Sequence, residues 1–164
     1  GLAVQDKSVL ILGSGGAARA IAMTLAYRGV SRITLTNRTA KKAHALAQDV
    51  NQKGRDCCTA IPMAAGPMQD VLRDTDILIN TTSVGMHPHE EQSPIDESLL
   101  HDHLVVYDLV YNPLRTKLLE AAQKKGCRIV EGLGMLVYQG AAAFELWTER
   151  EAPAEIMFDA IRPR

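Results

Sequence analysis

Short apolar runs alternate with longer segments of helical periodicity along this chain of 164 residues. The first run, Val9–Leu12, has four apolar residues with no polar interruption, which is typical of a strand buried on both faces. The Ala-rich segment 17–28 follows and stops before Gly29, which predicts a helix. The alternation continues, and it predicts strands at 8–12, 33–36, 55–61, 76–80, 104–108 and 127–130 and helices at 17–28, 40–53, 68–72, 116–125, 133–147 and 155–161.

Strands that alternate with helices predict parallel pairing through right-handed crossovers. We therefore expect an α/β fold of the Rossmann type, a doubly wound six-stranded parallel sheet in the order 3-2-1-4-5-6 with helices on both faces. Residues 55–61 make the poorest strand and should lie near an edge. The length suffices for one domain with its own core, and residues 1–164 show no repeat, linker or low-complexity segment.

A glycine-rich turn joins the first strand to the first helix in the pattern G-x-G-x-x-A, which is the dinucleotide-binding fingerprint. Gly13 allows the sharp turn, Gly15 lets the backbone approach a pyrophosphate, and Ala18 lets the helix pack on the sheet. The free N–H groups of the helix N-terminus favour phosphate binding. The alternative is a tight turn that binds nothing.

The end of the second strand indicates which dinucleotide the domain prefers. NAD-binding domains place an acidic residue there to bind the ribose 2′-hydroxyl. This chain has Asn37, Arg38 and Thr39 instead, followed by Lys41 and Lys42. The guanidinium of Arg38 matches the geometry of a phosphate, so the sequence predicts a preference for NADP. Lys41 alone is better interpreted as a solvated side chain.

Three later loops carry further candidates. Thr81, Thr82 and Ser83 follow the fourth strand and fit either a nucleotide cleft or an ordinary polar turn. Tyr111, after the fifth strand, is either a donor to substrate or a half-buried packing residue. After the sixth strand, Gly132 lies where a nicotinamide ring must approach the backbone, and Gln139 is polar among apolar neighbours.

Composition narrows the range of partners. Hydrophobic residues make up 46% and charged residues 23%, which is ordinary for a soluble globular protein. The net charge of -1 suggests neither nucleic acid nor a membrane surface, and no apolar run is long enough to span a bilayer. The three cysteines lack metal-ligand spacing and are interpreted as reduced thiols of a cytoplasmic protein. We expect no metal site, and a homodimer remains an open alternative.

The motifs together resemble one family. The segments VLILGSGGAARA, NRT, NTTSVGM, DLVYNP with Thr116, and GLGMLVYQGAAAFELWT are similar to the NADP-binding domain of shikimate dehydrogenase. The resemblance covers nearly the whole chain. It implies the reversible reduction of 3-dehydroshikimate to shikimate with NADPH, a step in aromatic amino acid (chorismate) biosynthesis.

The resemblance also implies residue roles. The residues that would hold the pyrophosphate are Gly13, Ser14, Gly15, Gly16 and Ala17. Asn37, Arg38 and Thr39 would hold the 2′-phosphate, with Lys42 where family members often have Arg. Leu109 falls where a Met commonly lies against the nicotinamide. Gly132 would contact the nicotinamide amide through its backbone. Tyr111 and Gln139 would reach the substrate.

The family's catalytic Lys–Asp pair and its shikimate-binding Ser and Asn groups belong to an N-terminal substrate domain, and nothing before Gly1 supplies them. No substitute is evident: Lys7 precedes the first strand, and the His87–Glu91 loop reads as a solvated turn rather than a metal or acid–base site. We therefore expect no catalytic residue in this chain, binding of NADP(H), and little or no turnover of shikimate without the missing domain.

Three other functions remain open at this point. The domain could belong to a quinate/shikimate enzyme with relaxed specificity. It could be a stand-alone dinucleotide-binding or regulatory module that accepts NAD and NADP alike. It could be an interaction protein whose glycine turn is only structural, in which case it would bind no nucleotide.

Overall fold

The computed structural model describes residues 2–161, and their centre is a sheet of six parallel strands in the order β3-β2-β1-β4-β5-β6. The predicted fold class and strand order are confirmed. The register pairs Leu12 with Thr36 of β2 and with Asn80 of β4, so the carboxyl ends of the central strands meet at one edge. The strands are β1 (Ser8–Leu12), β2 (Arg32–Asn37), β3 (Cys58–Pro62), β4 (Ile77–Asn80), β5 (Val105–Asp108) and β6 (Arg128–Val130).

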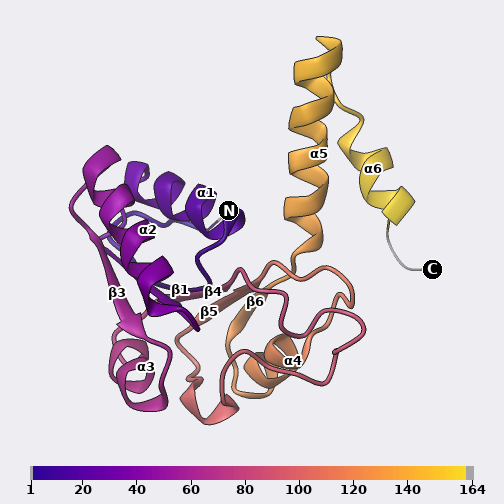
Figure 1. The fold of residues 1–164 in the computed structure, drawn as a ribbon. Coiled ribbons are helices and arrows are strands. Elements are labelled where there is room, and N and C mark those ends of the chain that lie inside the picture. Colours follow the sequence, from indigo (N-terminus) through magenta and orange to yellow (C-terminus); the bar gives the residue numbers. More distant parts are fainter. Residues whose placement is uncertain (1, 162–164) are drawn as a thin grey trace.

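Helices cover both faces of the sheet (Figure 1). The α1 and α2 helices lie on one side, with α3 and α4 on the other. Because neighbouring side chains of a strand point to opposite faces, Val9 and Ile11 join the core under α1 and α2, while Leu10 and Leu12 join the second core. The helices are α1 (Gly16–Tyr27), α2 (Ala40–Lys53), α3 (Ala65–Leu72), α4 (Lys117–Lys124), α5 (Leu133–Thr148) and α6 (Ala154–Ile161).

Local differences from the predicted elements have simple causes. The α3 helix begins at Ala65, before the predicted residue 68, because Pro67 lies in the first turn, where its missing N–H is tolerated. Thr39 occupies the N-cap position of α2, but its side chain makes no capping hydrogen bond. A short 3₁₀ helix at Glu97–Leu99, capped by Asp96, interrupts a segment for which we predicted no helix.

One stretch of the sheet is left uncovered. The α5 helix stands away from the sheet with α6 alongside it (Figure 1), and Tyr138 and Phe158 make an edge-to-face contact between the two helices. The face of β4 and β5 beside α1 therefore opens into a cavity of about 710 Å³ with apolar walls. No helix among residues 2–161 is both long and apolar enough to cross a membrane.

Candidate functional site

The glycine turn lies at the carboxyl edge of the sheet and depends on a residue without a side chain at its first position. Gly13 has φ +111°, in the region that favours glycine, and its N–H donates to the Thr36 carbonyl at 2.8 Å. A Cβ on Gly13 would come within 2.5 Å of Thr81 Oγ1. The turn is thus pressed against the loop that follows β4.

The next residues of the turn face open space. A Cβ on Gly15 or Gly16 would meet no atom within 4 Å, so packing inside the protein does not explain these glycines. Ala18 is fully buried and packs α1 against the sheet, as predicted. No side chain caps α1, so its first N–H groups are available for an anion. The geometry suits the close approach of a pyrophosphate.

A cationic group lies at the end of β2. Asn37 Nδ2 donates to the Thr39 carbonyl at 3.3 Å, which shapes the turn into α2. Arg38, Lys41 and Lys42 are exposed. None of them takes part in an ion pair within the described part of the chain. Free cations beside the glycine turn can pair with a phosphate without first breaking an internal ion pair.

In the loop after β4, two of the three predicted hydroxyl groups make hydrogen bonds that hold the loop in place. Thr81 donates from N and from Oγ1 to the Leu12 carbonyl, at 2.9 and 2.6 Å. Thr82 Oγ1 donates to Asn80 Oδ1 at 2.7 Å and accepts from Val84 N at 3.2 Å. Ser83 is exposed at the tip. The polar-turn interpretation thus describes Thr81 and Thr82, while Ser83 has its side chain at the surface.

The loop after β5 begins with a buried polar cluster. Asn80, Asp108 and Thr116 are at most 1% exposed. Asp108 Oδ1 accepts from Asn80 Nδ2 at 2.9 Å and from Val110 N at 3.0 Å, and Oδ2 accepts from Thr116 Oγ1 at 2.7 Å. Burial raises the pKa of the Asp108 carboxyl, and the hydrogen bonds from Thr116, Val110 and Asn80 act in the opposite direction.

The loop after β6 packs against the one after β5. A Cβ on Gly132 would lie 2.4 Å from the Leu109 carbonyl oxygen, so only glycine fits there. The Leu109 side chain is 8% exposed and joins the core under α1 and α2. Tyr111 is 43% exposed, a value that fits a half-buried packing residue as well as a donor to substrate.

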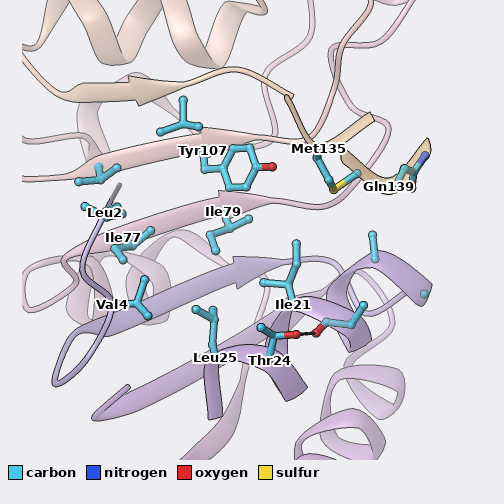
Figure 2. Close-up of a pocket in the computed structure, with 15 residues that line it drawn as sticks. Leu2, Val4, Ile21, Thr24, Leu25, Ile77, Ile79, Tyr107, Met135 and Gln139 are labelled. Atoms are coloured by element: carbon cyan, nitrogen blue, oxygen red, sulfur yellow. Dashed lines mark hydrogen bonds between the residues drawn. The ribbon is translucent and has the colours of Figure 1, made fainter. Parts of the chain in front are cut away.

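The cavity beside α5 gathers several of the predicted residues. Its walls include Gly16 and Ala17 from α1 and Gln139 from α5. Figure 2 shows Met135 and Gln139 at one end of the cavity and Leu2 and Val4 at the other. Gln139 therefore shares a cavity with the start of α1.

Two groups that the sequence analysis weighed as catalytic or metal-binding substitutes each make a contact with a neighbouring carboxylate. Lys7 Nζ pairs with Asp76 Oδ1 at 2.9 Å at the amino edge of the sheet, far along the strands from the glycine turn. His87 Nδ1 contacts Glu90 Oε1 at 2.8 Å on an exposed loop. Within residues 2–161, no three His, Cys, Asp or Glu side chains come close enough together to hold a metal ion.

Sequence reasoning assigned no role to Asp108 or Met135. The signal for Asp108 was a carboxylate that directly follows the apolar residues of a buried strand, since such a group needs partners. Met135 lies in the first turn of α5 and lines the cavity. Its position depends on how α5 leaves the sheet, which no local pattern reveals.

The parallel sheet, the open glycine turn and the free cations after β2 define the protein as a Rossmann-type dinucleotide-binding domain. The sequence profile described as "Shikimate / quinate 5-dehydrogenase" matches residues 2–109, and the profile described as "Shikimate 5'-dehydrogenase C-terminal domain" matches residues 132–162. The chain belongs to the shikimate dehydrogenase family.

Individual relatives agree with this family. A shikimate dehydrogenase (NADP(+)) of Methanopyrus kandleri is 49% identical over 156 residues, which cover 94% of this chain and 53% of the relative. The structure of shikimate 5-dehydrogenase from Listeria monocytogenes with shikimate and NAD matches with a TM-score of 0.89 and 33% identity, over 97% of this chain and 57% of that one. A shikimate dehydrogenase structure with NADP+ matches with a TM-score of 0.84 and 40% identity, over 96% and 54%. The chain thus spans about half the length of these relatives.

Proposed function

We propose that this chain is the NADP(H)-binding domain of a shikimate dehydrogenase, which reversibly reduces 3-dehydroshikimate to shikimate. The observation that carries the proposal is the unpaired cationic group after β2, Arg38 with Lys42, beside an open glycine turn. The name of the Methanopyrus kandleri relative specifies NADP(+), which supports the same cofactor.

The adenosine half of the cofactor would lie between the turn after β1 and the turn after β2. Gly13 to Ala17 would hold the pyrophosphate through backbone N–H groups at the start of α1. Asn37, Arg38, Thr39 and Lys42 would surround the 2′-phosphate. The Thr39 hydroxyl makes no capping bond, so it remains able to donate there.

The nicotinamide half would lie over the loops after β5 and β6. NADPH supplies the hydride when it is bound. The backbone at Gly132 and the buried Leu109 would orient the ring, and Thr81, Thr82 and Ser83 would shape the cleft between the two halves. Tyr111 is exposed and Gln139 lines the cavity, so both can extend from this domain toward a substrate.

Positioning of the substrate and transfer of a proton to its carbonyl oxygen would come from the rest of the enzyme. The relatives are nearly twice as long as this chain, and the described residues offer no acid–base pair beside the cavity. We therefore expect this chain to bind NADP(H) and to oxidise shikimate with NADP+ slowly or not at all.

Titration of the chain with NADPH, followed by the change in nicotinamide fluorescence, tests the proposal. We expect saturable binding of NADPH. NADH should bind about tenfold more weakly or worse, because charge-assisted hydrogen bonds to the 2′-phosphate contribute roughly 1.5–3 kcal/mol. Equal affinities for the two cofactors would support a non-selective module instead. Failure to bind either cofactor would refute the proposal. Steady-state shikimate oxidation at the rate of a full-length enzyme would refute the expectation that substrate positioning and proton transfer come from the rest of the enzyme.

A further inference from the structure

Asp108 is a charged group that is fully buried at the end of β5. Both of its carboxylate oxygens accept hydrogen bonds, from three different segments of the chain. A buried carboxylate loses its hydration, and apolar residues of similar volume are often as stable or more stable in such positions. Stability alone therefore does not explain this residue, and its geometry is the feature to consider.

The first link from Asp108 leads to the loop after β4. Asn80 donates through Nδ2 to Asp108 Oδ1, and its Oδ1 accepts from Thr82 N at 3.0 Å and Thr82 Oγ1 at 2.7 Å. An amide donates only through nitrogen and accepts through oxygen, so the acceptors of Nδ2 determine which way the Asn80 amide faces. The carboxylate is the nearer acceptor, and the Val84 carbonyl lies at 3.4 Å from the same nitrogen. With the amide reversed, Thr82 would lose its acceptor.

The link continues to the glycine turn. Thr81 follows Asn80 and donates twice to the Leu12 carbonyl, directly before Gly13. A Cβ on Gly13 would lie 2.5 Å from Thr81 Oγ1 and 3.3 Å from Thr82 Cγ2. The loop that Asp108 orients through Asn80 is therefore in contact with the turn that is proposed to hold the pyrophosphate.

The second link leads to the other half of the site. Asp108 Oδ1 also accepts from Val110 N, which fixes the backbone on both sides of Leu109. Gly132 lies against that backbone, since a Cβ there would be 2.4 Å from the Leu109 carbonyl oxygen and 2.7 Å from the Val110 carbonyl oxygen. One carboxylate oxygen is therefore shared between the links to the two halves.

We propose that Asp108 is a positioning residue that sets the spacing between the glycine turn and the Leu109–Gly132 surface, so that one dinucleotide can contact both. This inference rests on the proposed function. Asp108 does not touch the cofactor, and it acts through Asn80 on one side and through Val110 on the other. The third bond, from Thr116 Oγ1, points to the N-cap of α4 and only anchors the carboxylate.

Two ligands that differ only in the nicotinamide test this inference. NADP+ must contact both halves of the site, whereas 2′-phospho-ADP-ribose lacks the nicotinamide. In Asp108→Ala, we expect the affinity for NADP+ to fall by about tenfold or more, as for loss of a buried hydrogen-bond partner, and the affinity for 2′-phospho-ADP-ribose to change by less than about threefold. Calorimetry gives both dissociation constants.

Two further variants separate positioning from stability. In Asp108→Asn, the single carbonyl oxygen can accept from Asn80 and Val110, while the NH₂ faces Thr116 Oγ1, so we expect the ratio of the two affinities to return toward that of the wild type. Thr116→Val removes the bond to Asp108 Oδ2 and the capping bond that Thr116 Oγ1 accepts from Leu119 N, and leaves the bonds of Asp108 Oδ1 in place. We expect a lower melting temperature with an unchanged ratio of the two affinities. If Asp108→Ala does not fold, Asn80→Ala removes the same link to the loop after β4. In that variant, the affinity for NADP+ should fall relative to the affinity for 2′-phospho-ADP-ribose.

Each outcome has a distinct meaning. If Asp108→Ala or Asn80→Ala weakens both ligands equally, or neither, the inference is wrong and Asp108 is only structural. The inference is also wrong if Thr116→Val lowers the ratio as much as Asp108→Ala does. If the wild-type chain binds neither ligand, the proposed function fails first and the inference fails with it.

Discussion

The two halves of the proposed dinucleotide site are built in opposite ways. The half after β2 consists of exposed side chains, with Arg38 and Lys42 outside every internal ion pair of the described residues. The half after β4 and β5 rests on a buried cluster whose polar atoms are occupied by one another. Exposed cations can select a ligand without affecting the fold, whereas the buried cluster positions the backbone. We therefore expect the exposed half to determine which cofactor is selected and the buried half to determine the geometry of the site.

Replacing Arg38 should give the largest effect on binding and almost none on stability. We expect Arg38→Ala to weaken NADP+ by about tenfold to a hundredfold, because a charge-assisted bond contributes roughly 1.5–3 kcal/mol. Affinity for NAD+ and the free energy of unfolding should stay within about 0.5 kcal/mol of the wild type. Calorimetry and urea unfolding measure these quantities, with Arg28→Ala, an exposed cation at the end of α1, as the matched control.

Replacing Gly132 should show the reverse pattern on the buried half. An added Cβ would overlap backbone atoms of Leu109 and Val110 at 2.4 to 2.7 Å, so Gly132→Ala should lower the free energy of unfolding by about 1–3 kcal/mol. Gly134→Ala is the matched control, because its Cβ would meet no atom nearer than 4.0 Å and Ala favours the helix by about 0.5–1 kcal/mol. Urea unfolding that ranks Gly134→Ala as the less stable variant would contradict the packing described here.

Two carboxylates at opposite edges of the sheet should respond to pH in opposite directions. Hydrogen bonds from Ser8 N and Lys7 hold the pKa of Asp76 below its usual range, so its stabilisation is present above the unfolded-state pKa of about 4 and is lost as the pH falls through the folded-state pKa. Burial raises the pKa of Asp108, so its contribution is largest below that unfolded-state pKa and declines as the pH rises through the folded-state pKa. Urea unfolding between pH 3.5 and 7 should show that the advantage of the wild type over Asp76→Asn grows with pH. Over the same range, the difference in the free energy of unfolding between the wild type and Asp108→Asn should become smaller as the pH rises. The same sign for both would contradict the assigned surroundings.

The smallest effect concerns the thiols of the edge strand. Burial raises the pKa of the Cys58 thiol to about 12, and it also raises the pKa of Cys57, whose side chain is partly exposed. Iodoacetamide at pH 8 should therefore modify Cys57 before Cys58, without measurable loss of NADP+ binding. Peptide mapping by mass spectrometry gives the order. Equal rates at the two sites would show that β3 does not hold Cys58 in the core.

The two halves of the site also differ in how far they could be predicted from the sequence, because one is formed by neighbouring residues and the other by residues distant along the chain. The strands, their order and the glycine turn follow from local patterns, since apolar runs and Gly13 act within a few residues of one another. The free cations after β2 are adjacent in sequence, so their grouping was also visible. The hydrogen bonds of the buried cluster join Asn80 to Asp108, which are 28 positions apart, and Asp108 to Thr116, which are 8 apart. The pairing of β4 with β5 brings the first two together, and the position of the N-terminus of α4 adds Thr116.

The course of α5 could not be predicted for a similar reason. Its sequence is apolar on most sides, which fits a helix packed on the sheet as well as one standing away from it. The structure places it away from the sheet and leaves Trp147 80% exposed. The predicted helix is confirmed, but its apolar pattern does not specify that it packs against the neighbouring α6.

The central claim is that the loop after β2 recognises a phosphate on the adenosine ribose. The most direct measurement compares 2′,5′-ADP with 5′-AMP by calorimetry, since these ligands lack the nicotinamide and differ by that 2′-phosphate. We predict that 2′,5′-ADP binds about tenfold more tightly or better, and that Arg38→Ala removes most of the difference. Equal affinity for the two ligands in the wild-type chain would contradict the account.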